Sequence, residues 1–212
     1  MNLPSGSSVW ICALAAAVGY VLGALPSGYL IVRILRGKDV RSEGSGNIGA
    51  TNVLRTTGRT AGVATLLLDI AKGALAVAIG RWLAPPDAGG TSMSAAIAFL
   101  AVVTGHVFPV TLGLRGGKGV ACAVGGALVL APVAALISIG ALLATIAATR
   151  RVSPGSLVFA LLFPVFLAAG RSAEPSGWQA LCAAGASAIV IGRHASNIRR
   201  LLEGTEPRLG AR

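Results

Sequence analysis

The chain has 212 residues, of which 54% are hydrophobic and only 12% are charged. Soluble domains carry about 25% charged residues, so this chain cannot cover itself with polar surface in water, and a lipid bilayer is its natural solvent. Its 18 Lys and Arg against 7 Asp and Glu give a formal net charge of +11, which favours an anionic lipid face or an anionic substrate as partner. We expect no nucleic-acid partner, because basic residues with so few aromatics between them lack a stacking platform.

The apolar runs alternate with basic loops along the chain. The first run extends from Val9 to Leu35, long enough to span a bilayer with some tilt. Six basic residues then crowd one stretch: Arg33, Arg36, Lys38, Arg41, Arg55 and Arg59. Because positive charge stays on the cytoplasmic side, we place this loop in the cytoplasm and the N-terminus outside.

The middle runs continue this alternation. Ala61 to Leu83 leads out to a Pro- and Gly-rich turn at residues 85–90, and Met93 to Leu112 returns. The next run, from Val120 to Thr149, would be about 45 Å long as one helix, which exceeds a hydrocarbon core of about 30 Å. A break near Pro132 gives two short helices and keeps the following arginines inside.

The last two runs extend from Ser156 to Ala169 and from Gly177 to Gly192, and residues 171–176 form the turn between them. Every Lys and Arg except Lys72, Arg81 and Arg171 then falls on the inner side, which supports this orientation. We therefore predict an all-α integral membrane protein with seven transmembrane helices and a cytoplasmic C-terminus, in which residues 1–212 form a single polytopic domain.

The three cysteines, Cys12, Cys122 and Cys182, lie in apolar runs without metal-ligand or redox spacing. We interpret them as small buried hydrophobic residues and expect no metal site.

The first inner loop contains the sequence EGSGNIGATN at Glu43 to Asn52, with glycines in the pattern G-x-G-x-x-G. A dinucleotide-binding loop follows a buried strand, but here a charged run precedes the glycines and a membrane span follows them. The loop still suits another phosphate, because glycines let backbone N–H groups turn toward an anion and Arg55 adds a planar fork. A plain inner loop with lipid-facing arginines is the alternative.

A second glycine-rich stretch, GHVFPVTLGLRGGKGV, extends from Gly105 to Val120. It departs from a nucleotide-binding Walker loop at Leu112 and Gly119, so we do not expect nucleoside triphosphate hydrolysis. Lys118 in its glycine frame nevertheless has a phosphate-binding composition. His106 lies near the end of a span, where an ionisable residue is usually functional; a histidine bonded to a backbone carbonyl is the alternative.

The third stretch, GRHASNIRRLLEGTEPRL, extends from Gly192 to Leu209. His194 and Asn197 are three residues apart and share one face of a helix, while the neighbouring leucines and arginines resemble an interfacial helix or a solvated basic tail. Ser153, after two arginines, is placed to donate a hydroxyl to the same region. Three motif regions, at about residues 37–59, 105–120 and 192–209, would thus meet at one membrane face around an anion site.

These stretches resemble a known family. GSGNIGATNVLR, GHVFPVTLGLRGGKGVA and RHASNIRRLLEGTEPRL are similar to the three motifs of the acyl-phosphate:glycerol-3-phosphate acyltransferases, and LLLDIAKGALAV, with Asp69 and Lys72, fits the second span of that family. The resemblance covers the chain from about Val9 to Leu209. Ile48 stands where the family often has Pro, and Ala195 where a basic residue is common.

The resemblance implies a monomeric bacterial inner-membrane enzyme with its site on the cytoplasmic side. It would transfer a fatty acyl group from acyl phosphate to the 1-hydroxyl of glycerol 3-phosphate, giving lysophosphatidic acid and phosphate at the first step of phospholipid synthesis. Acyl phosphate is an activated anhydride, so no cofactor or metal is needed. By motif position the catalytic residues are Ser45, His106 and Asn197, and the substrate-binding residues are Gly46, Asn47, Gly49, Thr51, Asn52, Arg55, Arg115, Lys118, Ser153 and His194.

Two further expectations concern the chemistry. Neither His106 nor His194 has an Asp four residues later, so a buried His–Asp pair is not available by this spacing, and the proton of the attacking hydroxyl goes to a substrate phosphate or to His106. A membrane transporter of a phosphorylated solute is the alternative function, in which polar groups within a span would bind the substrate. The polar groups in a span here, Asp69 and Lys72, are i,i+3 and can pair with each other.

Overall fold

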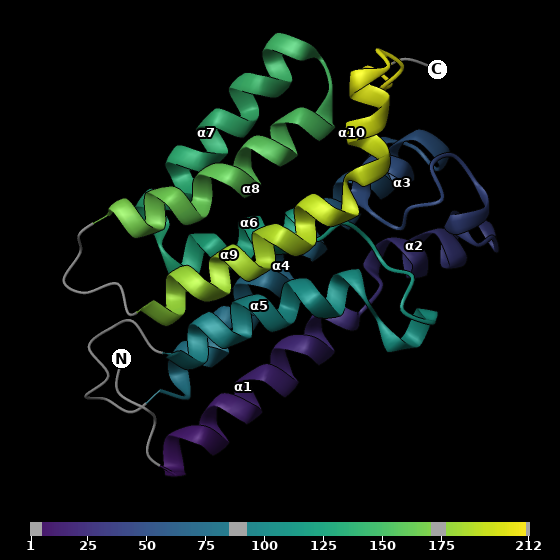
Figure 1. Ribbon diagram of the computed structural model, residues 1–212. Helices are drawn as coiled ribbons and strands as arrows, with labels where there is room; N and C mark the ends of the chain where they lie inside the picture. Colours follow the sequence, from purple (N-terminus) through teal and green to yellow (C-terminus); the bar gives the residue numbers. More distant parts are fainter. Residues whose placement is uncertain (1–5, 85–92, 171–176, 211–212) are drawn as a thin grey trace.

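The computed structural model describes residues 6–84, 93–170 and 177–210, which form helices and short 3-10 turns, with no strand in those ranges (Figure 1). The α-helices are α1 (Gly6–Ala24), α2 (Ser27–Arg36), α3 (Ala50–Thr56), α4 (Arg59–Trp82), α5 (Met93–Val107), α6 (Val120–Leu130), α7 (Pro132–Thr149), α8 (Val152–Ala169), α9 (Gly177–Arg193) and α10 (Ala195–Leu202). The 3-10 turns are η1 (Val40–Ser42) and η2 (Val110–Leu112). The turns predicted at 85–90 and 171–176 lie outside the described residues.

Five helical segments are long and apolar enough to cross a membrane: Val9–Arg36, Arg59–Trp82, Met93–Leu112, Pro132–Thr149 and Val152–Ala169. All five coincide with predicted spans. The two other predicted spans correspond to shorter helices, α6 with 11 residues and α9 with 17. The all-α, membrane-spanning class of the fold is therefore confirmed.

The first predicted span is broken into α1 and α2 at Leu25 and Pro26, where we expected one continuous helix. Proline has no N–H to donate, so a helix carbonyl before it loses its usual partner. That carbonyl, Leu22 O, accepts the N–H of Leu25 instead. The Lys72 ammonium on α4 binds two other carbonyl oxygens at the break, because it donates to Gly23 O at 3.1 Å and to Leu25 O at 2.7 Å. A cation at the C-terminal end of α1 also complements the helix dipole.

The predicted break near Pro132 is confirmed. Helix α6 ends at Leu130 and α7 begins with Pro132, a position where proline's missing N–H costs nothing. Helices α7 and α8 then form an antiparallel pair on one side of the bundle (Figure 1). On α8, Phe163 meets Phe99 of α5 in the core and Phe159 stacks on Phe163, which joins the pair to the rest of the bundle.

Small residues let the helices cross closely. A Cβ added at Gly23 of α1 would lie 2.2 Å from Val102 O on α5, and one at Gly125 of α6 would lie 1.9 Å from Ile70 O on α4. Such contacts are typical of helix packing in lipid, where association depends on close van der Waals contact. The three cysteines are buried and unpaired, as predicted.

The two ends of the bundle differ in chemistry. Trp10 near the start of α1, Trp82 at the end of α4 and Trp178 near the start of α9 all lie at one end. Tryptophan is enriched at the membrane–water interface. Helices α3 and α10 lie at the opposite end, where the three basic motif regions gather (Figure 1).

Candidate functional site

The glycine loop before α3 is built around one buried side chain, Asn52, which is 2% exposed. Its Nδ2 donates to the carbonyl oxygens of Val40, Glu43 and Asn47 at 3.3, 3.1 and 2.8 Å. Its Oδ1 accepts the N–H of Ser45 at 2.8 Å. The amide that we predicted to bind substrate therefore faces the backbone of its own loop, and its contacts fix the loop's shape.

The residues at the surface of this loop are free to face a ligand. Ser45 is exposed, and Gly46 beside it has φ of +70°, a conformation that a residue with a side chain rarely adopts. Asn47 Oδ1 accepts the N–H of Gly49 at 2.8 Å, so Asn47 shapes the turn into α3. The two remaining predicted residues of this region, Thr51 and Arg55, lie on α3, and Arg55 is exposed.

The second glycine-rich loop folds back onto the end of α5. The N–H groups of Gly116 and Gly117 donate to Val107 O at 3.1 Å and to His106 O at 3.0 Å. A Cβ at Gly117 would lie 2.0 Å from His106 Nε2, so only glycine fits against the imidazole ring. Lys118 follows at once and is thereby carried to the edge of the bundle. Arg115, at the tip of the loop, is exposed.

A polar network joins this loop to the C-terminal segment. Lys118 Nζ donates to Asn197 Oδ1. Asn197 Nδ2 and Ser153 Oγ both donate to Glu206 Oε1 at 2.6 Å, and Arg200 Nε donates to Glu206 Oε2 at 2.8 Å. Three predicted site residues, from the loop, α8 and α10, thus meet at a carboxylate that we did not predict.

The sequence did not mark Glu206 as a site residue, because Glu203 and Glu206 lie close together in a basic segment and nothing local distinguishes them. Glu203 pairs with Arg199 at i,i+4 on the surface, with 48% of its side chain exposed. Glu206 is 7% exposed. The sequence signal was present only in the motif GTEPRL, and packing against α8 separates the two glutamates.

The network sets the charge state of its members. Burial lowers the pKa of Lys118 to about 8; Glu206 opposes this shift, and the positive charges of Arg200, Arg55 and Arg193 add to it. Arg55 of the first motif therefore lies within electrostatic range of Lys118 of the second. Burial alone would raise the pKa of Glu206, but its hydrogen bonds from Ser153, Asn197 and Arg200 hold that pKa below its usual value.

His194 is 2% exposed at the junction of α9 and α10. Its Nδ1 lies 2.8 Å from Val190 O, and since a carbonyl can only accept, Nδ1 carries the proton. Burial lowers the pKa of His194 to about 4, so this imidazole is neutral at pH 7.

A hydrogen bond also links the first two motif regions, because Arg41 Nη1 donates to Leu112 O at 3.2 Å.

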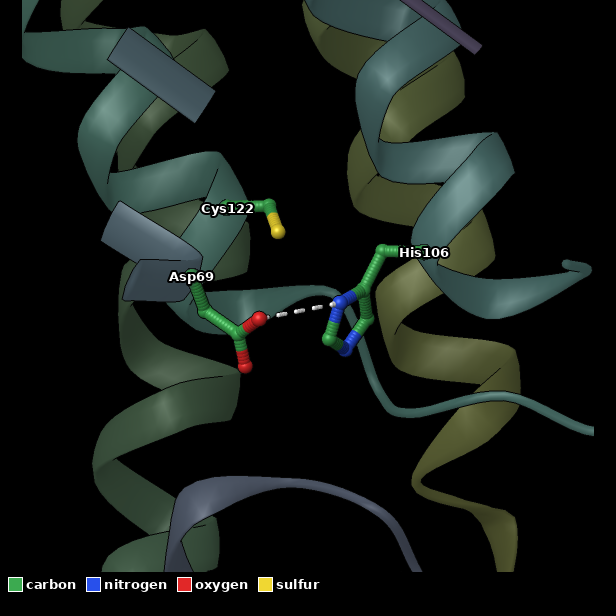
Figure 2. Close-up of side chains that lie close together, drawn as sticks. All are labelled: Asp69, His106 and Cys122. Atoms are coloured by element: carbon green, nitrogen blue, oxygen red, sulfur yellow. Dashed lines mark ion pairs between the residues drawn. The ribbon is translucent and has the colours of Figure 1, made fainter. Parts of the chain in front are cut away.

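His106 lies apart from these groups, inside the bundle, and is 4% exposed. Figure 2 shows its imidazole beside Asp69, with Nδ1 at 3.7 Å from Asp69 Oδ1. Lys72 Nζ lies 2.9 Å from the same oxygen. The Asp69–Lys72 pair that the i,i+3 spacing allows is present. The spacing argument excluded only an Asp four residues after each histidine, and the structure instead places Asp69 of α4 beside His106 of α5.

Cys122 on α6 completes this cluster, and single ligand atoms of Asp69, His106 and Cys122 lie within 4.8 Å of one another (Figure 2). Three such donors resemble part of a metal site. The Lys72 ammonium, however, already balances the Asp69 charge at hydrogen-bond distance. A divalent cation would have to displace or repel it, so this donor set favours an ion pair beside a neutral imidazole.

Comparison with known proteins shows which family the chain resembles in sequence and fold. The family profile described as "Glycerol-3-phosphate acyltransferase" matches residues 13–204. A glycerol-3-phosphate acyltransferase of Thermosynechococcus vestitus is 43% identical over 208 residues, 95% of this chain and 96% of the relative. One of Gluconobacter oxydans is 45% identical over 199 residues, 92% of each chain.

Two solved structures share the fold. One is PlsY, an integral membrane glycerol 3-phosphate acyltransferase, in its glycerol 3-phosphate form, with a TM-score of 0.83 and 36% identity over 97% of this chain and 96% of that chain. The other is the lysophosphatidic acid form of PlsY, with a TM-score of 0.81 and 34% identity over 93% and 94% of the two chains. Profile, sequence identity and fold agree that the chain belongs to the glycerol-3-phosphate acyltransferase family.

Proposed function

We propose that this acyltransferase transfers a fatty acyl group from acyl phosphate to the 1-hydroxyl of glycerol 3-phosphate. The products are lysophosphatidic acid and inorganic phosphate. The observation that carries the proposal is the network in which Lys118, Ser153 and Asn197, from separate stretches of the sequence, are joined through Glu206 at the end of the bundle that also holds α3 with Arg55. The related PlsY was crystallised in glycerol 3-phosphate and lysophosphatidic acid forms, which are the acceptor and product of this reaction.

Arg55 and Lys118 bind the phosphate groups of the two substrates, acyl phosphate and glycerol 3-phosphate. Arg55 offers a planar fork suited to two phosphate oxygens, and Lys118 a point charge held by Asn197. We assign Arg115 of the same loop, Ser153 at Glu206 and His194 at the start of α10 to substrate binding as well. Two neighbouring phosphates repel each other, so cations that bind both lower this repulsion and align hydroxyl and acyl carbon.

The chemistry then needs no cofactor or metal, because the acyl–phosphate anhydride is already activated. The hydroxyl oxygen attacks the acyl carbon, and the bond from this carbon to the phosphate oxygen breaks. Ser45 or Asn47, with backbone N–H groups of their loop, stabilises the developing oxyanion; the N–H groups of Gly46 and Gly49 are already bonded to Glu43 O and Asn47 Oδ1 and shape the loop instead. The hydroxyl proton goes to a phosphate oxygen of the substrate or to His106.

The membrane placement follows from charge and tryptophan. In the proposed topology α6 and α9 also cross the membrane, alone or as part of a hairpin, which gives seven helices with the N-terminus outside. The basic motif end faces the cytoplasm by the positive-inside rule, and Trp10, Trp82 and Trp178 anchor the outer interface. The chain acts as a monomer in the inner membrane. The alternative function, transport of a phosphorylated solute, is disfavoured because the relatives are acyltransferases.

The test is direct. Detergent-purified protein is mixed with acyl phosphate and glycerol 3-phosphate, and phosphate release is followed. We expect release that requires both substrates and yields lysophosphatidic acid, whereas Lys118→Ala should bind glycerol 3-phosphate poorly. Phosphate release without acceptor, or acyl transfer from thioester donors but not from acyl phosphate, would contradict the proposal. A His106→Gln enzyme with the parent's pH–rate profile would exclude His106 as the base.

A further inference from the structure

The glycine loop that carries Lys118 is held by a side chain that the motif analysis did not select, Arg193 in the last turn of α9. Arg193 Nη2 donates to Gly116 O at 3.3 Å. The side chain is exposed, and within the described residues it has no ion pair and no other hydrogen bond. A guanidinium with five donors thus makes its one contact with the backbone of the loop, two residues before Lys118.

The contact fixes one end of a single peptide unit. The carbonyl of Gly116 and the N–H of Gly117 belong to the same peptide bond, and that N–H donates to His106 O at 3.0 Å. The unit is therefore bound to α5 through its N–H and to α9 through its carbonyl. A peptide between two glycines is otherwise easy to rotate, because glycine adopts φ of either sign at little cost. Arg193 opposes that rotation, which would break the contact with His106 O and loosen the loop.

The far end of the loop also lies against α9. A Cβ added at Gly119 would lie 3.4 Å from Val190 Cγ2, about one turn before Arg193 on the same helix. Lys118 lies between these two contacts, and its ammonium donates to Asn197 Oδ1 on α10, the helix that follows α9. The position of Lys118 therefore depends on α9 for the backbone and on α10 for the ammonium.

Arg193 also contributes charge at this position. The ionisable groups that act on Lys118, or on which it acts, are Glu206, Arg55, Arg193, Arg200 and the neutral His194. Only one of them is an anion, and Glu206 is already paired with Arg200 at 2.8 Å. The remaining positive charges repel one another, and a bound phosphate would relieve this repulsion.

We propose that Arg193 is a positioning residue for Lys118. It holds the Gly116–Gly117 peptide in the orientation that presents the Lys118 ammonium to the phosphate of glycerol 3-phosphate. In this role Arg193 does not bind the substrate itself, because its donor is directed to a backbone carbonyl. The inference rests on the proposed acyl transfer and adds to it the residue that keeps the second motif ready to bind.

Three substitutions separate this role from direct phosphate binding. Arg193→Met keeps an apolar stem but removes the donor and the charge, so the KM for glycerol 3-phosphate at pH 7 should rise about fivefold. The value of kcat should change by less than about threefold, since the loop acts in binding. Arg193→Lys should return KM to within about twofold of the parent, because one carbonyl needs one donor. Arg199→Met removes a charge from a side chain that is 81% exposed and should leave both constants unchanged.

The lysine variant decides between the two roles. A guanidinium that binds phosphate through its planar fork is not replaced by an ammonium. Failure of Arg193→Lys to restore KM would therefore overturn the positioning role.

A double-mutant cycle tests whether Arg193 acts through Lys118. Lys118→Ala already lacks the ammonium that the loop presents, so adding Arg193→Met should lower kcat/KM by less than about twofold. Initial rates at low substrate concentration give kcat/KM even when binding is weak. A loss in this background as large as the loss in the parent would overturn the inference.

A titration of Lys118 gives a readout that does not depend on activity. The chain has three lysines, Lys38, Lys72 and Lys118, so lysine enriched in ¹³C at Cε gives three signals, and the Lys118→Arg spectrum assigns one of them. The pKa of Lys118 should be higher in Arg193→Met than in the parent, because a like charge has been removed. Arg193→Lys and Arg199→Met should match the parent.

The titration also separates the inference from the proposed function. An unchanged midpoint in Arg193→Met would overturn the inference, because Arg193 would then not lie beside Lys118. A parent without acyl transfer would instead refute the proposed function, while the titration would still decide whether Arg193 faces Lys118.

Discussion

The two hydrogen-bonded centres at the motif end are organised in opposite ways. The first glycine loop is shaped by the neutral side chain of Asn52, whose partners lie within 12 residues of it in sequence. The network around Glu206 is charged and joins Ser153, Lys118, Asn197 and Arg200, which lie on three separate parts of the chain. Loss of the hydrogen bonds in the first centre should disturb only its own loop. Loss of those in the second should weaken the contacts between the Lys118 loop, α8 and α10.

The largest expected effect is on activity, from Asn52→Ala. The change removes all four hydrogen bonds that define the loop, so under the proposed function Ser45 and Asn47 lose their positions beside the acyl-phosphate group. Misplacement of catalytic groups by about 1 Å can cost about 100-fold in rate, and we expect a loss of kcat/KM of about that size.

The matched control is Ser42→Ala, which removes a single hydrogen bond of the same inner loop, from Ser42 Oγ to Asp39 O, and should cost far less activity. The melting temperature of Asn52→Ala should fall only slightly, because its contacts stay within one loop. A large fall, equal to that of a core variant, would show that Asn52 also supports the bundle.

Breaking the other centre should reduce stability as well as activity. Glu206→Ala leaves the buried donors of Ser153 and Asn197 unpaired and removes the anion of Arg200, so the free energy of unfolding should fall by about 1–3 kcal/mol. Lys118 also loses the negative potential of Glu206. Thermal unfolding in detergent, with phosphate release from the same sample, measures both.

Glu203→Ala is the control within the same segment. Its partner Arg199 is 81% exposed, and such surface pairs contribute about 0–1 kcal/mol. The lowered pKa of Glu206 also gives a pH signature: its stabilisation is present above the pKa of the unfolded chain, near 4.5, and is lost as the pH falls below it. Equal melting temperatures for the two alanine variants would refute the role of Glu206.

The difference between the centres also explains what the sequence could predict. Hydropathy and charge asymmetry identified five spans and the break near Pro132, because both depend on local composition. The break at Pro26 was missed although Pro26, Ser27 and Gly28 interrupt the Val9–Leu35 run, because a proline in a long apolar segment does not show whether the helix continues past it. The lysine that binds the carbonyl oxygens at this break lies 46 residues further along the chain. Short amphipathic α10 was likewise visible in the pattern of Ile198, Leu201 and Leu202.

Site residues could be predicted where they belong to a sequence motif. They could not be predicted where their role depends on contacts between segments that are distant in sequence. The motifs pointed to Lys118, Ser153 and Asn197, which the structure brings together. Nothing local marks Glu206 as buried or Asp69 as the neighbour of His106, because these contacts cross between segments 53 and 37 residues apart. Asn52 was chosen for its hydrogen-bonding groups, and only the fold shows that they point into the loop.

A smaller effect, on pH dependence, should come from the charged centre. The pKa of Lys118 is lowered to about 8, so the ammonium is present below that pH and is lost as the pH rises through it. At about pH 9 only about one-tenth of the free enzyme retains the cation, and the KM for glycerol 3-phosphate should rise about tenfold relative to pH 7.

Lys118→Arg should keep its charge over this range and flatten the profile, although the larger side chain lowers overall activity. Steady-state kinetics at several pH values measures KM and kcat separately. A parent KM that is constant to pH 10, with the second phosphate ionisation accounted for, would mean that Lys118 does not bind the acceptor phosphate.

The smallest effect is expected at the exposed edge of the first centre, from Arg55→Lys. Arginine and lysine both carry a positive charge, so the Arg55→Lys change removes only the second hydrogen bond that the guanidinium fork can donate. A loss of about 1 kcal/mol corresponds to about a fivefold rise in KM, with kcat nearly unchanged if the clamp acts equally in the ground and transition states. Arg59→Lys, at the exposed start of α4, is the matched control and should leave both constants unchanged. Equal behaviour of the two variants would remove Arg55 from the phosphate clamp and leave Lys118 as the cation on which phosphate binding depends.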